Sequence, residues 1–352
     1  MDLANPKVEA PLNLKTLALL VVSSLVFVGC SPSDSGSGSG GTGTASTTSG
    51  SGGTGGGSGD LTIAVIPKGT THAFWKSVEA GAENAGKELG AKILWKGPLK
   101  EDDRAGQIDI VKQFTTDKVS AIVLAPLDDQ ALQSPVQAAT EKGIPVVIID
   151  SALKGDAGKD FVGLVATDNH KGGELAGERL GKLLNGKGKV VLLRYAVGSA
   201  STEARESGFM DAIKKFPGIQ VISDNQYAGA TQSEAQTKAM QMVDTLKGAD
   251  GVFTPNESST AGMHNALKQM GLQGKIKFVG FDASAELIDD LKGGEIDALV
   301  AQNPVKMGYE GVKAAIDKIH GKTIPPVTDT GAVVIDKDNL ETPDIQKLLS
   351  GK

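Results

Sequence analysis

From residue 60 onward, the chain alternates short apolar runs rich in β-branched residues with stretches whose apolar residues recur every three or four positions. This alternation limits the possible fold most strongly, because it predicts parallel strands with helices packed on both faces of a sheet. The runs are apolar on both faces, as buried parallel strands require. Ten runs exceed one ordinary sheet, and they cover residues 61–66, 91–95, 120–125, 145–150, 161–166, 189–195, 219–223, 251–254, 277–281 and 297–301.

Two α/β lobes of five or six strands each are the most economical arrangement of these runs. The chain has 352 residues, and the part from residue 60 onward is long enough for two lobes of ordinary domain size. Helices are predicted between the runs from apolar residues on one face, first at Phe74, Val78, Ala82, Ala85 and Leu89. We therefore predict an α/β fold with two doubly wound parallel sheets.

The amino-terminal part does not follow this pattern. Residues 16–29 form an apolar run, TLALLVVSSLVFVG, which is too short to span a bilayer comfortably and has the length of a signal-peptide core. The run ends at Cys30, the only cysteine, and the sequence FVGC resembles the lipobox of bacterial lipoproteins. We expect residues 1–29 to be a lipoprotein signal peptide and Cys30 to carry a lipid that anchors the protein to a membrane outside the cytoplasm. The alternative is a buried free thiol.

Residues 31–59 consist almost entirely of glycine, serine and threonine. Such a composition cannot bury enough apolar surface to fold, so residues 30–59 are predicted to be the acylated cysteine and a disordered tether. The tract contains a GxGxxG match at Gly36, Gly38 and Gly41, but this match neither follows a strand nor opens a helix. Composition alone explains it, and it does not indicate a dinucleotide site.

Charge and motifs argue against several function classes. The formal net charge of -6 provides no basic surface for nucleic acid. The four histidines lack the spacing of metal ligands. The acidic residues in 101–104 are predicted to begin a helix, where the helix dipole stabilises them. We therefore expect no metal and no cofactor. The chain has neither a GxxxxGK[ST] loop nor a GxSxG elbow, which predicts a protein that is not an enzyme. The carboxylates of Asp150 and Asp282 leave glycoside processing open as a less favoured alternative.

Polar side chains follow several of the predicted strands. In open α/β sheets ligands bind beyond the carboxyl ends of the strands, and the polar residues there are Asp150, Asn256, Asp282 and Gln302. The loop after the first strand supplies His72, Phe74 and Trp75. Carboxylates and amides bind hydroxyl groups, aromatic rings pack against the C–H faces of sugars, and two aspartates disfavour an anionic ligand. This inventory predicts a neutral polyol ligand, although each polar residue alone could be a helix cap.

Seven segments resemble the ribose-binding type of periplasmic binding protein, the sugar receptors of bacterial ABC importers. They are THAFWKSVEAGA at 71–82, IPVVIID at 144–150, VATDN at 165–169, ARESGF at 204–209, TPNES at 254–258, VGFD at 279–282 and VAQNP at 300–304. The resemblance implies two lobes joined by three crossovers, with residues 60–167 and 303–331 in lobe 1 and residues 168–302 and 332–352 in lobe 2. It also implies that a monosaccharide is captured by hinge closure and passed by a monomeric receptor to an ABC permease and its ATPase.

The same resemblance implies a set of ligand-binding residues. His72 stands where the ribose receptors carry an amide, and Ser151 stands where they carry an arginine. The bound molecule could therefore be a pentose, a hexose or a related polyol. The implied ligand-binding residues are His72, Phe74, Trp75, Asp150, Ser151, Arg205, Asn256, Asp282 and Gln302.

Two other functions fit a chain with this fold. A sugar-responsive transcription regulator would need an amino-terminal helix-turn-helix, and this chain has an apolar run and a glycine-rich tract there. A sensory receptor subunit that reports a sugar to a chemoreceptor or kinase would need the same binding residues. The sequence does not separate sensing from transport.

Overall fold

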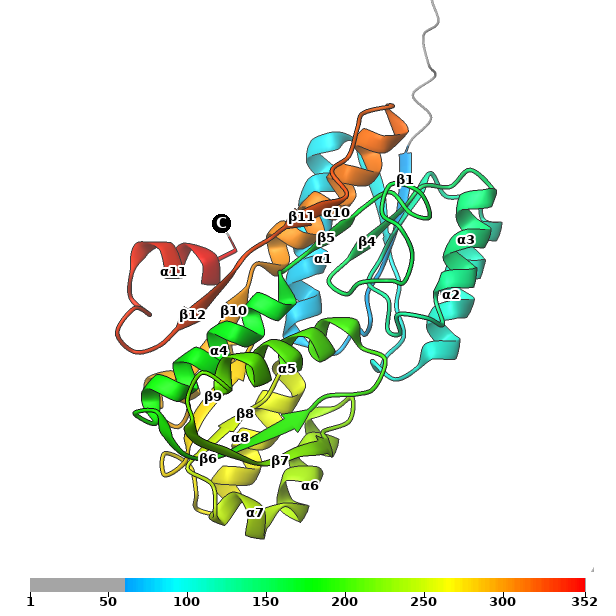
Figure 1. Cartoon of the computed structure of the whole chain (residues 1–352). Helices are drawn as coiled ribbons and strands as arrows, with labels where there is room; N and C mark the ends of the chain where they lie inside the picture. Colours follow the sequence, from blue (N-terminus) through cyan, green and yellow to red (C-terminus); the bar gives the residue numbers. More distant parts are fainter. Residues whose placement is uncertain (1–60, 352) are drawn as a thin grey trace, which may run out of the picture. The chain divides into compact units, whose positions relative to one another are not determined.

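The computed structural model describes residues 61–351, which form two six-stranded sheets with helices packed against them (Figure 1). The predicted signal peptide, Cys30 and the predicted tether lie outside the described residues, so these assignments stay predictions. Within residues 61–351, none of the helices combines the length and the apolar character needed to cross a bilayer.

The first sheet is entirely parallel and has the order β11-β5-β4-β3-β1-β2. Its strands β3 and β4 are fully buried because helices cover both faces: α1 (Ala73–Leu89) and α10 (Pro304–Ile319) on one, α2 (Arg104–Thr116) and α3 (Gln133–Glu141) on the other. The strands are β1 (Leu61–Ile66), β2 (Ala91–Trp95), β3 (Ala121–Leu124), β4 (Val146–Ile149), β5 (Leu164–Ala166) and β11 (Val327–Asp329).

The second sheet repeats this arrangement with the order β12-β10-β9-β8-β6-β7, and only β12 runs antiparallel to its neighbour. Helices α4 (Asn169–Leu183) and α5 (Ala200–Ile213) cover one face. The other face carries α6 (Gln232–Gln241), α7 (Val243–Lys247), α8 (Glu257–Gln269), α9 (Ala285–Gly293) and α11 (Pro343–Leu349). The strands are β6 (Lys187–Arg194), β7 (Gly218–Tyr227), β8 (Gly251–Phe253), β9 (Lys277–Phe281), β10 (Ala298–Gln302) and β12 (Ala332–Ile335).

The predicted fold class is confirmed, and all ten predicted runs contain strands. The sequence interpretation missed β11 and β12, which have three and four residues. β11 has the sequence VTD, follows directly after Pro325 and Pro326 and contains no apolar run, whereas the AVVI run of β12 is apolar and β-branched and could have been found.

The chain passes between the two sheets three times: between β5 and β6, between β10 and β11, and between β11 and β12. These crossovers are joined to one another. The hydroxyl of Thr167 donates to Gln302 Oε1 at 2.9 Å and lies 3.3 Å from Thr330 Oγ1. The lobe boundaries after residues 167, 302 and 331 stay a prediction, and the strands on either side of each boundary belong to different sheets.

Close helix packing in the first lobe depends on glycine. An added Cβ at Gly81 of α1 would lie 2.0 Å from Val305 O, and one at Gly308 of α10 would lie 2.0 Å from Val78 O. Any larger residue would push α1 and α10 apart. This packing fixes the amino terminus of α1, where the residues 72–75 lie, relative to the crossover that follows β10.

Candidate functional site

The carboxyl ends of the strands of both sheets and the amino termini of several helices meet at one cavity. Strands β1 and β6, each next to the edge strand of its sheet, occupy the positions where the chain reverses its direction of winding, which is where open α/β sheets form a crevice. The cavity is lined by Lys68, His72, Phe74, Trp75, Glu101, Asp150, Ser201, Thr202, Arg205, Asn256, Glu257, Asp282 and Gln302. Eight of the nine residues predicted for the site are in this set, and the exception is Ser151.

Ser151 lies behind the cavity wall. It is completely buried, and its Oγ accepts a hydrogen bond from the backbone N–H of Ser201 at 3.0 Å. Ser201 is in α5 of the second lobe, while Ser151 follows β4 of the first lobe. Ser151 therefore joins the two lobes beside the cavity.

The aromatic side of the cavity is formed by Phe74 and Trp75. Their rings meet edge to face, with 4.9 Å between centroids and an angle of 85° between the planes. Trp75 is buried in the core against β1 and β3, while Phe74 is only partly buried. Adjacent residues of a helix do not face the same side, which explains why Phe74 and Trp75 differ in burial. Both side chains nevertheless line the cavity.

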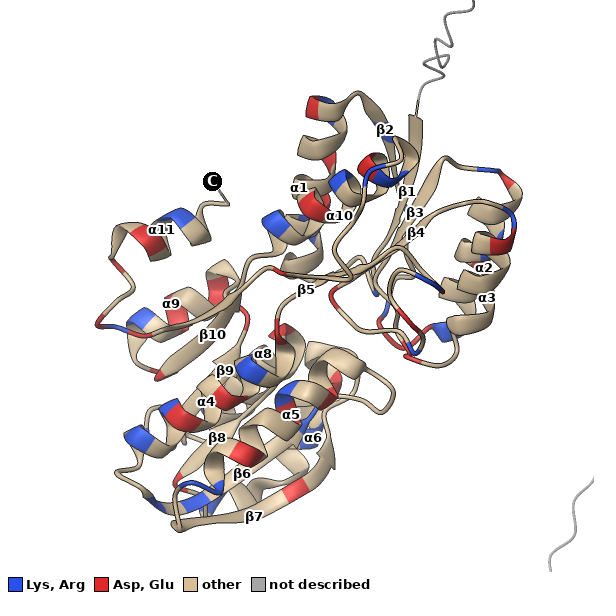
Figure 2. Ribbon diagram, turned by 45° about the horizontal axis from the view of Figure 1, so that its top comes forward, with Lys and Arg blue, Asp and Glu red and all other residues tan. Residues whose placement is uncertain are grey.

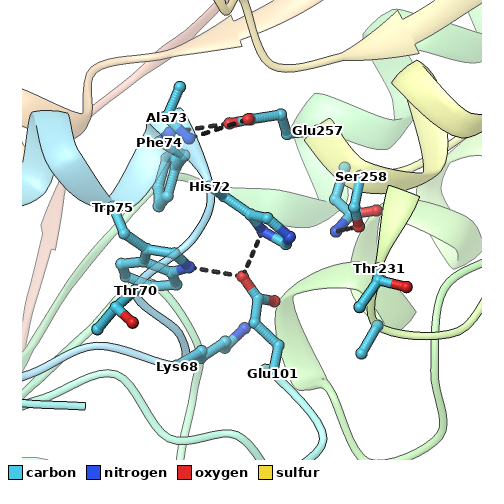
Figure 3. Close-up of polar contacts among 12 residues, drawn as sticks. Lys68, Thr70, His72, Ala73, Phe74, Trp75, Glu101, Thr231, Glu257 and Ser258 are labelled. Atoms are coloured by element: carbon cyan, nitrogen blue, oxygen red, sulfur yellow. Dashed lines mark hydrogen bonds and ion pairs between the residues drawn. The ribbon is translucent and has the colours of Figure 1, made fainter. Parts of the chain in front are cut away.

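Glu101 holds three ring side chains, and the sequence interpretation missed it. Its Oε1 accepts from Trp75 Nε1 and pairs with His72 Nδ1 at 2.8 Å (Figure 3). Its Oε2 accepts from the hydroxyl of Tyr195 at 2.8 Å. Residues 101–104 were expected to begin a helix. Helix α2 begins only at Arg104, so Glu101 belongs to the preceding turn and points into the cavity.

The pair of His72 and Glu101 is ionised at neutral pH. Burial alone would raise the pKa of Glu101, but the charge and hydrogen bond of His72, with Lys68 and the Trp75 N–H, lower it to about 2. Burial alone would lower the pKa of His72, but the charge and hydrogen bond of Glu101, with Glu257 and Asp282, raise it to about 9. Since Glu101 occupies Nδ1, the protonated ring keeps its Nε2–H as a second donor.

Asp150 forms a buried ion pair with Lys68. The distance from Lys68 Nζ to Asp150 Oδ2 is 2.8 Å, and Nζ also donates to Ser201 Oγ at 2.9 Å. Lys68 was missed, although it is the first charged residue after β1 and the search of strand ends could have found it. A buried charge needs a partner, and Lys68 supplies one for Asp150.

Arg205 and Asp282 form the opposite wall. Arg205 is 2% exposed, lies 4.0 Å from the centre of the Phe281 ring, and donates from Nε to Asn169 Oδ1 and from Nη1 to Pro255 O. Its buried Nη2 has no hydrogen-bond partner among residues 61–351. The neighbouring Glu206 is not its partner, because Glu206 pairs with Arg194 at 2.7 Å. Arg205 therefore has a donor to spare at the cavity.

Asp282 accepts from Gln302 Nε2 at 2.7 Å and from the Glu257 backbone N–H at 2.8 Å. Burial raises its pKa to about 6, because Arg205 and these hydrogen bonds only partly offset the loss of water around the carboxylate. Each oxygen of Asp282 still has lone-pair capacity beyond one hydrogen bond. The carboxylate can therefore accept further hydrogen bonds from hydroxyl groups.

Asn256 and Asp168 each cap the amino terminus of a helix. Asn256 lines the cavity and at the same time caps α8, since its Oδ1 accepts from the Ser259 N–H at 3.3 Å. Asp168 caps α4 by accepting from the Lys171 N–H at 3.0 Å. Asn256 therefore both caps a helix and lines the cavity.

Charged residues elsewhere are of both signs. Figure 2 shows basic and acidic residues interspersed along the helices. The sequence spacing did not reveal one cluster of titratable side chains. In it, His264 lies 3.0 Å from Asp290 and 2.7 Å from Glu295. Each nitrogen of the imidazole faces its own carboxylate, which is the geometry of a cluster of ion pairs.

Comparison with known proteins finds relatives over most of the chain. Residues 63–323 match the model of the periplasmic binding protein domain. The D-allose-binding periplasmic protein of Escherichia coli strain K12 is 30% identical over 268 residues, which cover 74% of this chain and 86% of that protein.

Solved structures also resemble this fold. A carbohydrate transporter solute binding protein from Agrobacterium radiobacter, in complex with D-arabinose, is 34% identical with a TM-score of 0.79, covering 83% of this chain and 100% of that one. An ABC transporter solute binding protein from Agrobacterium vitis with bound D-fucose is 35% identical with a TM-score of 0.79, covering 82% and 99%.

Proposed function

Because this chain belongs to the periplasmic binding protein family, we propose that it captures one monosaccharide, a pentose or a hexose, or a related polyol, and presents it to an ABC importer. Its relatives are substrate-binding proteins, and this chain is likewise a binding protein and not an enzyme. The proposal extends to the ligand that similar proteins hold, since their names include D-allose, D-arabinose and D-fucose.

The observation that carries the proposal is the unpaired donor of Arg205 in a cavity that also presents Asp282 and two aromatic rings. A buried guanidinium N–H without an acceptor is costly, and a sugar hydroxyl would satisfy it. The carboxylate of Asp282 would accept from a neighbouring hydroxyl, while Phe74 and Trp75 would contact the C–H face of the ring.

The charges of the cavity support a neutral ligand. Lys68 is paired with Asp150, and His72 is paired with Glu101. Asp282 lies in the field of Arg205, which lowers its pKa against the effect of burial. The residues that line the cavity include four carboxylates, of Glu101, Asp150, Glu257 and Asp282, and three cations, of Lys68, His72 and Arg205, so the charge of an anionic ligand would not be balanced.

Closure and location follow from the same proposal. The cavity lies between two lobes that are joined by three crossovers, which suits hinge closure around a ligand. We place the protein outside the cytoplasm, held to a membrane by a lipid on Cys30, and expect it to act as a monomer with a permease and its ATPase. A sensory receptor subunit would use the same cavity and differ only in its partner.

A thermal-shift screen of residues 60–352 against pentoses, hexoses and polyols tests the proposal. A sugar at a hundred times its dissociation constant stabilises the fold by about 2.7 kcal/mol. For about 290 folded residues that corresponds to roughly 4 to 5 °C. A shift with a sugar supports the proposal, whereas no shift with any of them would direct the search to other small solutes.

A further inference from the structure

Glu257 bonds helix α1 from the opposite side of the cavity. Its Oε1 accepts from the backbone N–H of Ala73 at 2.9 Å, and its Oε2 accepts from the N–H of Phe74 at 2.8 Å (Figure 3). Ala73 and Phe74 begin α1, which packs on the first sheet. Glu257 begins α8, which packs on the second sheet. One carboxylate therefore joins a helix of each lobe.

The amino terminus of α1 lacks a cap from its own lobe. The first N–H groups of a helix have no partner within the helix, and they are usually satisfied by the side chain of the residue before it. That residue, His72, makes no such bond because its ring is held by Glu101. A carboxylate is favoured at this end of a helix by the helix dipole. Glu257 thus supplies a cap that α1 can have only when the lobes meet.

The same residue also positions Asp282. The backbone N–H of Glu257 donates to Asp282 Oδ2 at 2.8 Å, while its side chain holds the N–H of Phe74. Each side-chain oxygen of Glu257 accepts one backbone N–H, so the carboxylate is hydrogen-bonded directly to the first turn of α1. Through these bonds it sets the start of α1, with Phe74, against the carboxylate of Asp282.

We propose that Glu257 is a positioning residue that holds the lobes closed: its carboxylate caps α1 across the cavity and favours the closed arrangement even without sugar. This inference rests on the proposed hinge closure and is independent of which molecule is bound. Other bonds across the cavity, such as that from Tyr195 to Glu101, add to closure. Ser151 contributes in a similar way, because its Oγ accepts from the Ser201 N–H in the first turn of α5. Glu257 differs in that one carboxylate accepts two N–H groups of the same helix end.

The test measures the ratio of closed to open lobes in the sugar-free chain. The full chain with Cys30→Ser receives spin labels at Lys112→Cys in α2 and Gln241→Cys in α6, both exposed, and the distance between the labels is measured by pulsed EPR. Glu257→Gln keeps the size of the side chain but loses the charge and one of the two acceptors. We expect its closed-to-open ratio to be about tenfold lower than that of the parent. Glu286→Gln, which removes an exposed glutamate from the first turn of α9, is the control and should leave the ratio unchanged.

Amide hydrogen exchange provides a second readout on the same variants. The N–H groups of Ala73 and Phe74 should exchange faster in Glu257→Gln, while those of the later turns of α1 stay protected, which shows that the helix is folded. An unchanged ratio and unchanged exchange would overturn the proposal, and so would a parent chain with no closed population. Because no sugar is used, a chain that binds no sugar can still pass this test, and a chain that binds sugar can still fail it.

Discussion

Asp150 and Asp282 lie at equivalent positions of the two sheets and share a left-handed backbone, with φ of 62° and 72°. Each follows directly after a strand, β4 in the first sheet and β9 in the second. Residues other than glycine adopt this conformation at some cost, and aspartate is among those that tolerate it best. At both positions the aspartate side chain lies at the cavity. Backbone strain of this kind clusters at functional sites, so it supports the binding role proposed for both carboxylates.

Replacing Arg205 by alanine should weaken sugar binding at least tenfold. The expectation follows from the donor that Nη2 offers to the cavity, since hydrogen bonds involving a charged group contribute about 1.5 to 3 kcal/mol. Isothermal titration with a sugar found in the thermal screen measures the effect, and circular dichroism checks that the variant is folded. Arg194→Ala is the control, because Arg194 pairs with Glu206 away from the cavity lining. Equal affinity in Arg205→Ala and the parent would remove Arg205 from the site.

Replacing Asp282 by asparagine should change the dependence of stability on pH. Burial raises the pKa of Asp282 to about 6 from its usual 3.8, so the folded state binds the proton more tightly than the unfolded state. This contribution is complete below pH 3.8 and is lost as the pH rises through 6. Relative to the parent, Asp282→Asn should therefore gain stability between pH 4 and pH 7, by about 2 to 3 kcal/mol. Denaturant unfolding of both proteins at the two pH values measures this, and a constant difference would contradict the raised pKa.

Replacing Glu101 by glutamine should destabilise the fold by about 3 kcal/mol, because it leaves the buried His72 charge without its partner. The pKa of Glu101 is lowered to about 2, so its contribution is present above pH 4.5 and is lost as the pH falls toward 2. Urea unfolding at pH 7 measures the effect. Asp102→Asn changes the charge of the exposed neighbouring residue and should have little effect. Equal losses in both variants would show that the pair with His72 contributes nothing specific.

The imidazole of His72 should titrate near pH 9. Its folded pKa lies above the usual 6.5, so the stability it contributes is complete below pH 6.5 and is lost as the pH rises through 9. Carbon-13 NMR of the labelled histidine ring follows the titration directly. In Glu101→Gln the midpoint should fall, since the charge and hydrogen bond that raise it are gone. A midpoint near 6.5 in the parent would contradict the ion pair with Glu101.

The fold could be predicted from the sequence because the strands inside both sheets are parallel and mostly buried. Their apolar, β-branched runs are visible one by one, and the βα alternation fixes how they are connected. Strand β11 could not be found in this way, because two of its three residues are polar and only its pairing with β5 makes it a strand. Strand β12 has the apolar run AVVI and could have been found, although it lies at the edge of its sheet and pairs antiparallel with β10.

The site could be predicted where a polar residue follows a buried strand, as Asp150, Asp282 and Gln302 do. Glu101 and Glu257 carry no such signal. The partners of Glu101 include Tyr195, 94 positions along the chain, and the partners of Glu257 lie 183 and 184 positions before it. Their roles depend on how the two lobes meet, which no local pattern encodes.

Isothermal titration of residues 60–352 with D-allose, D-ribose, D-arabinose and D-fucose tests whether the cavity binds a monosaccharide. We expect that at least one of these sugars binds with one site per chain, and that the double variant Arg205→Ala, Asp282→Ala loses this binding while remaining folded. No heat of binding with any sugar, or equal binding by the double variant, would contradict this expectation.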